Sequence, residues 1–210
     1  MDVFTPLEIM PCCSAAGLDF RIIPAGFNAS LGFESKRLEF LTGFTAISQR
    51  SSVRAYKPTD VEEDKLKKVL EAARLSPSAS NRQDWKFIVV RNKETRKKLA
   101  KAAFGQSFIA EAPVVIAACG MEPNAMLACG QPMHTVDVSI ACAYMILQAH
   151  ALGLGTCWIG AFKEDETKEI LGIPEYLRVV AMTPLGYSNQ PPSQKSRKSL
   201  DQIVSYEKYE

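Results

Sequence analysis

The chain has 210 residues, of which 47% are hydrophobic and 23% are charged. This length and composition allow one sizeable core but are short for two independent enzyme domains. The net charge of +2 gives no electrostatic basis for binding nucleic acid, and no apolar run approaches the roughly 18 residues that a membrane helix needs. We therefore expect one domain, with neither nucleic acid nor a membrane as a partner.

The cysteines include no CxxC pair and no spacing typical of a metal site, so no metal is predicted. Three of them lie in apolar runs, where a thiol serves as a small hydrophobe. Free thiols are usual in a reducing compartment, and the start of the chain lacks the positive region of a signal peptide, so we expect a cytoplasmic protein. The six residues are Cys12, Cys13, Cys119, Cys129, Cys142 and Cys157.

Residues 1–34 are rich in Gly, Pro and Ala without sustained periodicity, and are interpreted as an N-terminal extension of unknown role. Helical spacing of Phe40, Phe44 and Ile47 marks the start of the folded unit. The folded domain is therefore predicted to comprise residues 35–210.

The next predicted helix has apolar residues at helical spacing over residues 66–73. Residues 59–62 have the pattern of a capping box at its start, and Pro77 ends it. A β-branched run at residues 87–90 predicts a buried strand.

Between this helix and strand lies the stretch SPSASNRQDW, residues 76–85. Its hydroxyl and amide side chains both donate and accept hydrogen bonds, which suits a heterocycle with several carbonyls and ring nitrogens. A capped turn without a ligand is the alternative. The four side chains concerned are Ser78, Ser80, Asn81 and Gln83.

Further along the chain, the pattern predicts an exposed helix, an apolar central strand, a loop, a helix, and a strand in which Pro184 indicates an edge or a bulge. A polar arm, SNQPPSQKSRKS, follows the last strand, and an arm of this kind often reaches a partner subunit. The exposed helix covers residues 94–103, the apolar strand 112–119 and the loop 122–133. The second helix covers residues 165–171 and the last strand 177–187.

The long helix predicted over residues 135–152 is apolar nearly all round. A helix of that kind must be covered on every face, and in a domain this small a second copy of the chain is a natural cover, so we predict a homodimer. A fully internal core helix is the alternative. One predicted face carries Val136, Ile140, Ala143, Leu147 and Ala151, and the other faces carry Val138, Cys142, Met145, Ala149 and Leu152.

Two compact basic clusters flank the folded unit, one over residues 50–54 and one over residues 195–198. Both combine Arg or Lys with Ser, which is the donor set that neutralises a phosphate. Solvated surface is the alternative for each cluster taken alone.

Five motifs in this order resemble the FMN-dependent nitroreductase family: QRSSVRAY, ARLSPSASNRQDWKFIVV, APVVIAAC, LGLGTCWIGAF and PLGY…PPSQKSRKSLDQIVSY. The resemblance runs from about Phe44 to Tyr206. It implies an α+β nitroreductase-like fold with a central mixed β-sheet flanked by helices. It also implies an intertwined homodimer with two FMN sites at the interface and an exchanged C-terminal arm.

The resemblance further implies that Arg50, Ser52 and Arg54 hold the phosphate, ribityl chain and pyrimidine edge of FMN. Lys195 and Arg197 would close on the phosphate. Ser51 stands where many members have a second basic residue, so its hydroxyl would take that place.

The loop would contact the flavin from the other subunit, through Pro77, Ser78, Ala79, Ser80 and Asn81, and Gln83 is included in the same site. Ile159, Gly160 and Ala161 would pass behind the isoalloxazine ring, where a backbone N–H can bond N5. Two further departures from the family pattern are Asp84, where proline is usual, and Ala161, where a second glycine is common.

The implied activity is reduction of nitroaromatic, quinone or similar electron-poor acceptors by a ping-pong mechanism, with NADH or NADPH as hydride donor. Arg54 is the first candidate to stabilise the negative charge of reduced flavin. One alternative is a reductive dehalogenase or a flavin-consuming relative. A second is an FMN-binding storage or sensor protein without turnover.

Two histidines, one tryptophan and one Gly-Leu-Gly sequence are interpreted as having no role in catalysis or cofactor binding. His134 and His150 lack a neighbouring nucleophile or carboxylate pattern and are interpreted as structural or surface residues. Trp158 is interpreted as a core residue. The sequence Gly-Leu-Gly at residues 153–155 follows a helix and lacks the third glycine of a dinucleotide fingerprint.

Overall fold

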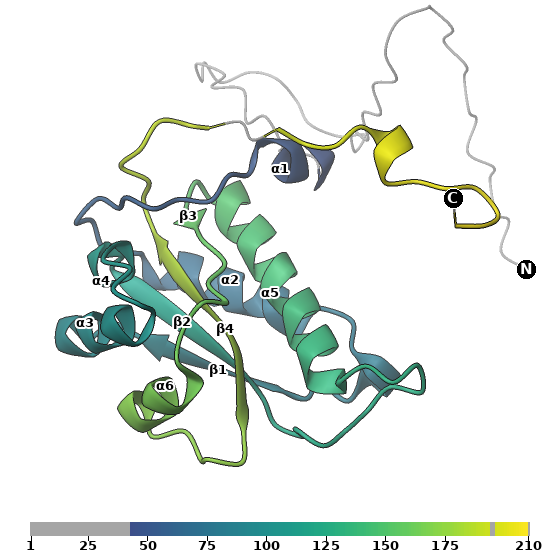
Figure 1. Ribbon diagram of the computed structural model, residues 1–210. Helices are drawn as coiled ribbons and strands as arrows, with labels where there is room; N and C mark the ends of the chain where they lie inside the picture. Colours follow the sequence, from purple (N-terminus) through teal and green to yellow (C-terminus); the bar gives the residue numbers. More distant parts are fainter. Residues whose placement is uncertain (1–42, 194–195, 210) are drawn as a thin grey trace, which may run out of the picture. The chain divides into compact units, whose positions relative to one another are not determined.

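The structure is a computed structural model that describes residues 43–193 and 196–209, so the predicted extension over residues 1–34 lies outside the described residues. The described chain mixes helices with one sheet, which is the α+β architecture that the sequence predicted (Figure 1). In chain order the elements are α1 (Gly43–Gln49), α2 (Glu63–Arg74), η1 (Ala79–Asn81), β1 (Trp85–Val90), α3 (Lys93–Ala102), α4 (Phe108–Glu111), β2 (Val114–Gly120), α5 (Met133–Ala151), β3 (Gly155–Thr156), α6 (Glu164–Leu171), β4 (Arg178–Gly186) and η2 (Leu200–Gln202).

The sheet has the strand order β1-β2-β4-β3. All ladders between these strands are antiparallel, and the parallel component of the predicted mixed sheet is an isolated bridge between Ser52 and Thr156. The bridge adds residues from the start of the domain to the edge formed by β3. The first basic cluster is thereby attached to the sheet.

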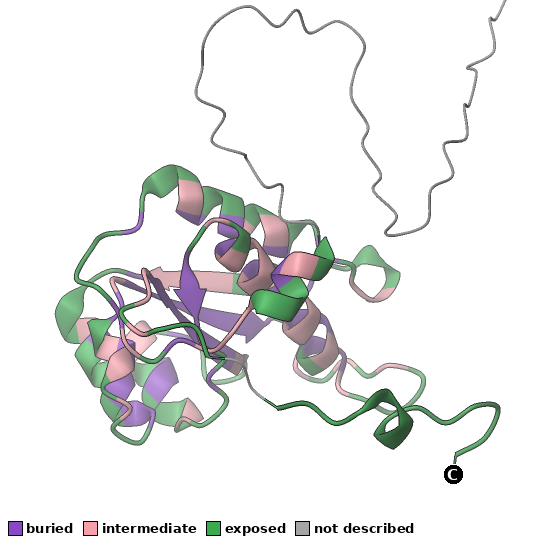
Figure 2. Ribbon diagram, turned by 90° about the horizontal axis from the view of Figure 1, so that it is seen from above, coloured by how far each residue is buried: buried purple, intermediate pink, exposed green. Residues whose placement is uncertain are grey.

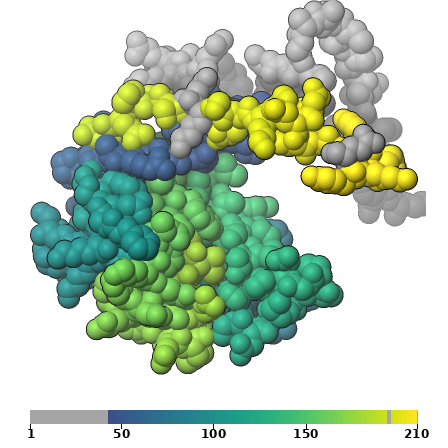
Figure 3. Space-filling model, in the orientation of Figure 1, coloured from purple at the N-terminus to yellow at the C-terminus, as the bar shows by residue number. Residues whose placement is uncertain are grey.

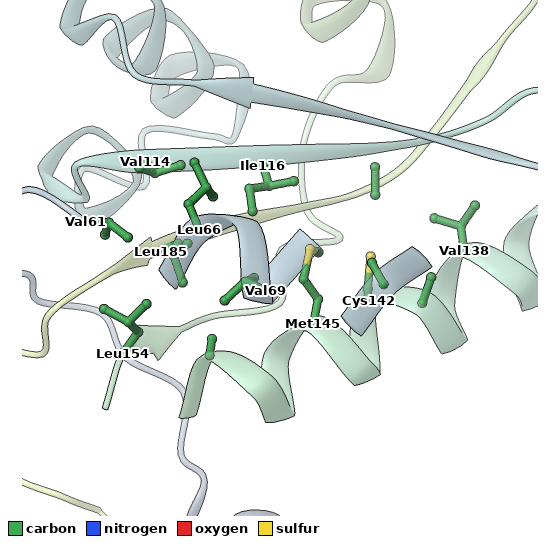
Figure 4. Packing of buried hydrophobic residues seen from close by; sticks show 14 residues of the cluster. Val61, Leu66, Val69, Val114, Ile116, Val138, Cys142, Met145, Leu154 and Leu185 are labelled. Atoms are coloured by element: carbon green, nitrogen blue, oxygen red, sulfur yellow. The ribbon is translucent and has the colours of Figure 1, made fainter. Parts of the chain in front are cut away.

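Helices cover both faces of the sheet, with α2 and α5 on one face and α3, α4 and α6 on the other (Figure 1). The all-apolar strand β2 lies between these two layers and is buried along its whole length, as its continuous apolar run predicts. Val114 and Ile116 of β2 point toward α2 and α5, where they pack with Met145 (Figure 4). Burial falls off outward, and the peripheral helices expose their outer faces (Figure 2).

The start of α2 differs from the sequence prediction. The capping box is wrong, because the helix begins at Glu63 and its N-cap residue, Glu62, makes no capping hydrogen bond through its side chain. The Glu62 carboxylate instead accepts hydrogen bonds from the Tyr187 hydroxyl (2.8 Å) and from Lys65 Nζ (3.2 Å). These contacts tie the start of α2 to the chain just after β4.

Pro184 does not lie on an edge strand, because β4 pairs with β2 on one side and β3 on the other. Backbone N–H groups alternate sides along a strand, so the Pro184 nitrogen faces the same side as the Met182 N–H, which bonds to Ile159. The two-residue ladder of β3 ends beside Pro184, and pairing resumes only at the bridge between Ile159 and Met182. The proline thus occupies the gap in this ladder.

Helix α5 has one covered side and one uncovered side in the single chain. Val138, Cys142, Met145 and Ala149 are buried in the core. On the other side Val136, Ile140 and Leu147 are only half-buried, and Ala143 and Ala151 are exposed. The alternative of a fully internal helix is therefore wrong.

None of the helices in the described ranges combines the length and apolar character needed to cross a membrane.

Glu164 joins α6 to β4 and predicts a pH-dependent stability. Its carboxylate accepts hydrogen bonds from Arg178 Nε (3.0 Å) and from the Val179 N–H (2.8 Å), and Lys168 Nζ lies 3.4 Å away. Burial alone would raise the pKa of Glu164, but these hydrogen bonds and the charges of Arg178 and Lys168 outweigh it and lower the pKa.

Because the folded pKa of Glu164 lies below the unfolded one, its stabilisation is present above about pH 4.3 and is lost as the pH falls through the folded pKa. Glu164→Gln should therefore lower the melting temperature at pH 7 and flatten its decline between pH 5 and pH 3, as measured by thermal denaturation. Parallel pH profiles for the two proteins would contradict this role.

Candidate functional site

The first basic cluster lies on a segment held by neighbours on both sides. The Val53 N–H donates to the Thr156 carbonyl of β3 (2.8 Å), and the buried Tyr56 hydroxyl donates to the Val53 carbonyl (2.9 Å). Gly155 permits this approach, because a Cβ there would lie 2.6 Å from Val53 Cγ2. On the other side the segment lies against residues 187–190 (Figure 3).

Gln190 fixes the backbone between the predicted phosphate ligands. Its Oε1 accepts a hydrogen bond from the Arg54 N–H (2.8 Å), and its Nε2 donates to the Ser52 carbonyl (3.2 Å). Both backbone groups are thus satisfied, and the Arg54 side chain remains exposed. Gln190 was not predicted as a site residue; its position directly before the closing PPSQ motif was the available signal.

The two predicted halves of the phosphate site meet in one cavity. Arg50 and Ser51 line a cavity of about 420 Å³ together with Arg197 from the second basic cluster. Lys195 lies outside the described residues. A neighbouring cavity of about 190 Å³ is lined by Arg50, Ser51 and His150, at the last turn of α5. Burial, with the charge of Arg50, lowers the pKa of His150, which leaves the imidazole neutral at pH 7.

The predicted flavin loop lies at the opposite end of α5 and has an unusual backbone. Ser80, Asn81 and Gln83 have φ values of 51°, 55° and 55°. The left-handed region disfavours residues with a side chain, so three such residues in one short loop represent stored strain. Pro77 and all three of these residues are exposed, while Ser78 and Ala79 are half-buried. The loop therefore presents its polar groups outward.

Asp137 anchors this loop to α5. The Ala79 N–H donates to both carboxylate oxygens of Asp137, at 3.2 and 3.1 Å, and the Asp137 side chain is buried. Within the loop the Gln83 N–H donates to Ser78 Oγ (3.0 Å). Asp137 was not predicted as a site residue, although an acidic residue in a largely apolar 19-residue helix was a visible signal.

Removing the Asp137 carboxylate should loosen the loop. In Asp137→Ala the half-buried Ala79 N–H loses its acceptor, which costs about 1–3 kcal/mol. Amide exchange at Ala79 should accelerate by about 5- to 150-fold, as measured by hydrogen–deuterium exchange. Asp137→Asn keeps a carbonyl acceptor and is the control. Equal acceleration in both variants would show that the charge, and not the hydrogen bond, holds the loop.

Asp84, one of the departures from the family pattern, also has a structural role. It is buried, and its Oδ2 accepts a hydrogen bond from the Glu122 N–H (3.0 Å). Arg82 forms an ion pair with the Glu122 carboxylate. Asp84 therefore joins the loop to the segment at residues 122–133.

The third predicted segment follows β3. Ile159 is buried, and its N–H and carbonyl are both used in hydrogen bonds to Met182 (2.9 and 3.0 Å). Gly160 and Ala161 are exposed, and within the described ranges their N–H groups donate no hydrogen bond. Among the described residues, both N–H groups are therefore available to a ligand. Trp158 is 40% exposed, so its interpretation as a core residue is wrong.

The length of α5 separates the loop from the phosphate cluster. Asp137, which holds the loop, lies in its second turn, and His150, beside Arg50, lies in its last turn. At about 1.5 Å per residue these positions are roughly 20 Å apart along the helix. The predicted site residues therefore form two separate groups within one chain.

Comparison with known proteins identifies the family. The model of the nitroreductase family matches residues 47–120 and 104–187, which together cover more than half of the chain. The chain belongs to the nitroreductase family. This assignment confirms the resemblance inferred from the five motifs, and with it the nitroreductase-like fold.

Several known proteins are similar to this chain over most of their length. A protein of Thermus thermophilus named NADH dehydrogenase is 30% identical over 204 residues, covering 80% of this chain and 97% of the relative. An FMN reductase [NAD(P)H] of Bacillus subtilis is 28% identical, covering 78% and 73%. The solved structure of an FMN-dependent nitroreductase from Clostridium difficile R20291 has 31% identity and a TM-score of 0.68, covering 78% and 98%.

Proposed function

We propose that this member of the nitroreductase family is an FMN-dependent oxidoreductase. It takes a hydride from NADH or NADPH and reduces nitroaromatic, quinone or similar electron-poor acceptors by a ping-pong mechanism. The names of its relatives support the enzyme class, FMN and the nicotinamide donor. The acceptors and the mechanism are our extension of that class.

The observation that carries the proposal is the arrangement of donors at the two ends of α5. Arg50, Ser51 and Arg197 line one cavity at the end near His150, and the polar loop projects from the other end. These two groups are complementary parts of a flavin nucleotide site, but one chain holds them roughly 20 Å apart. A second copy of the chain would bring the loop of one protomer to the cavity of the other.

The donor set fits FMN part by part. The guanidinium groups of Arg50 and Arg197 suit a phosphate, and the Ser51 hydroxyl adds a neutral donor. The loop hydroxyls and amides suit the carbonyls and nitrogens of the pyrimidine ring. The N–H groups of Gly160 and Ala161, which have no partner among the described residues, suit the N5 side of the ring.

When bound, FMN supplies the hydride chemistry, so the protein needs no general base. The chain's own residues bind, orient and tune the cofactor. Gln190 holds the Ser52–Arg54 backbone in place, which leaves the exposed Arg54 guanidinium to stabilise negative charge at the pyrimidine edge of the reduced ring.

The assembly we propose is a homodimer joined along the uncovered face of α5. Val136, Ile140 and Leu147 supply apolar area on that face. The C-terminal arm supplies more, because Leu200, Ile203 and Tyr206 are 72%, 63% and 84% exposed. An arm of that composition would pack on the neighbouring protomer. A cytoplasmic location accords with the unpaired thiols of the four described cysteines.

The visible absorption spectrum of the purified protein tests the function. Flavin bands that bleach on anaerobic addition of NADH or NADPH, and recover on addition of a quinone or nitroaromatic, are the expected result. Bands that persist with both donors would identify a storage or sensor protein. A colourless protein that cannot be reconstituted with FMN would refute the proposed function.

A further inference from the structure

Trp158 directly precedes the segment at residues 159–161 of the proposed flavin site, and its surroundings suggest a role for it in that site. It lies on an extended segment between Cys157 and Ile159, which are 2% and 3% exposed. Successive side chains of an extended segment point in opposite directions, so the indole points away from the core that buries its neighbours. The result is a large aromatic side chain, 40% exposed, held on a fixed backbone.

The indole nitrogen of Trp158 lies beside Gly160. A Cβ placed on Gly160 would be 3.5 Å from Trp158 Nε1, which is ordinary van der Waals contact. In the described part of the chain the indole N–H of Trp158 donates no hydrogen bond, and neither do the backbone N–H groups of Gly160 and Ala161. The indole N–H of Trp158 is therefore an unpaired donor on an exposed side chain next to Gly160.

The backbone that carries these donors is fixed at both ends. Ile159 is bonded twice to Met182 of β4, and the Ala161 carbonyl accepts a hydrogen bond from Gln106 Nε2 (3.2 Å). Beyond it, the Lys163 N–H donates to the Ala102 carbonyl (2.8 Å). An indole donor carried on a fixed backbone is suited to a planar ligand with hydrogen-bond acceptors along one edge.

We propose that Trp158 is a flavin-binding residue whose indole N–H, beside Gly160, donates to the polar edge of the isoalloxazine ring. The proposal rests on the proposed function. It makes Trp158 a ring contact, whereas Arg50 and Arg197 are phosphate contacts. The two kinds of residue should therefore respond differently to riboflavin, which has the ring but lacks the phosphate.

The test compares Trp158→Phe, which keeps an aromatic ring and loses the N–H, with the native protein. Loss of one hydrogen bond should weaken FMN and riboflavin binding by the same factor, about 2- to 12-fold, as measured by fluorescence titration. FMN should also quench the emission of Trp158, which is obtained by difference because Trp85 is the one other tryptophan.

Trp158→His, which retains a ring N–H donor, should recover part of the affinity, and melting temperatures should show that the apo variants are folded. Native affinity of Trp158→Phe for both flavins, with no quenching assigned to Trp158, would overturn the proposal. Failure of the native protein to bind any flavin would instead refute the proposed function.

Discussion

Arg50→Ala is expected to weaken FMN binding by about 30-fold to a few thousand-fold. Arg50 lines the cavity that also contains Ser51 and Arg197, and the neutral His150 nearby cannot replace its charge. Removing one partner of a buried charge pair costs roughly 2–5 kcal/mol, which corresponds to that range of affinity. Equilibrium titration of the apo protein with FMN measures the effect.

Riboflavin provides the control for Arg50→Ala. Because riboflavin lacks the phosphate, its affinity should be nearly unchanged in the variant. Arg50→Lys should retain part of the FMN affinity, since lysine keeps the charge but not the bidentate geometry. An equal loss of affinity for both flavins would mean that Arg50 supports the fold of the segment and does not bind phosphate.

Leu147→Glu is expected to give a folded monomer without FMN. Leu147 is half-buried on the α5 face that we assign to the interface, and two-fold symmetry would bury the new charge twice. Burying an unpaired carboxylate costs several kcal/mol, which is enough to dissociate a dimer at micromolar concentration. Loss of the dimer separates the loop from the phosphate cavity, so the cofactor should be lost too.

Sedimentation velocity and the visible spectrum measure the two effects of Leu147→Glu, and circular dichroism confirms that the fold is retained. Tyr176→Glu is the matched control, because Tyr176 is 69% exposed between α6 and β4 and the charge change is the same. A Leu147→Glu protein that remains dimeric and yellow would place the interface elsewhere.

Hydrophobic periodicity was sufficient to predict most of the fold. The helical stripe over residues 66–73 became α2, and the apolar run over residues 112–119 became the buried strand β2. Gly172 adopts the left-handed conformation that ends α6, as a glycine at a helix end predicts. Such elements can be predicted from the sequence, because the apolar pattern that marks the buried face lies within the element itself.

Predictions failed where a residue's role depends on a distant partner. The capping box failed because Glu62 bonds to Tyr187, which is remote in sequence. The inner strand β4 accommodates Pro184 because the ladder of the two-residue strand β3 ends beside the proline, and no sequence pattern revealed that length. Trp158 is apolar, yet alternation with two buried neighbours turns it outward.

The site could be predicted as a set of residues but not as an arrangement. The motifs named Arg50, Ser51 and Arg197, and the structure brings these three to one cavity. The left-handed backbone of the loop, and its attachment to Asp137, could not be inferred, because both depend on packing against α5. The separation of the two groups likewise became apparent only from the fold.

This separation along α5 has a genetic consequence. If each site combines the phosphate cavity of one chain with the loop of another, damage at one end of the helix affects one half of a site and leaves the other half sound. Two defective chains, one impaired at Arg50 and one at Asp137, would then pair to form one intact site and one doubly damaged site. Alleles that are inactive separately would complement each other within a single assembly.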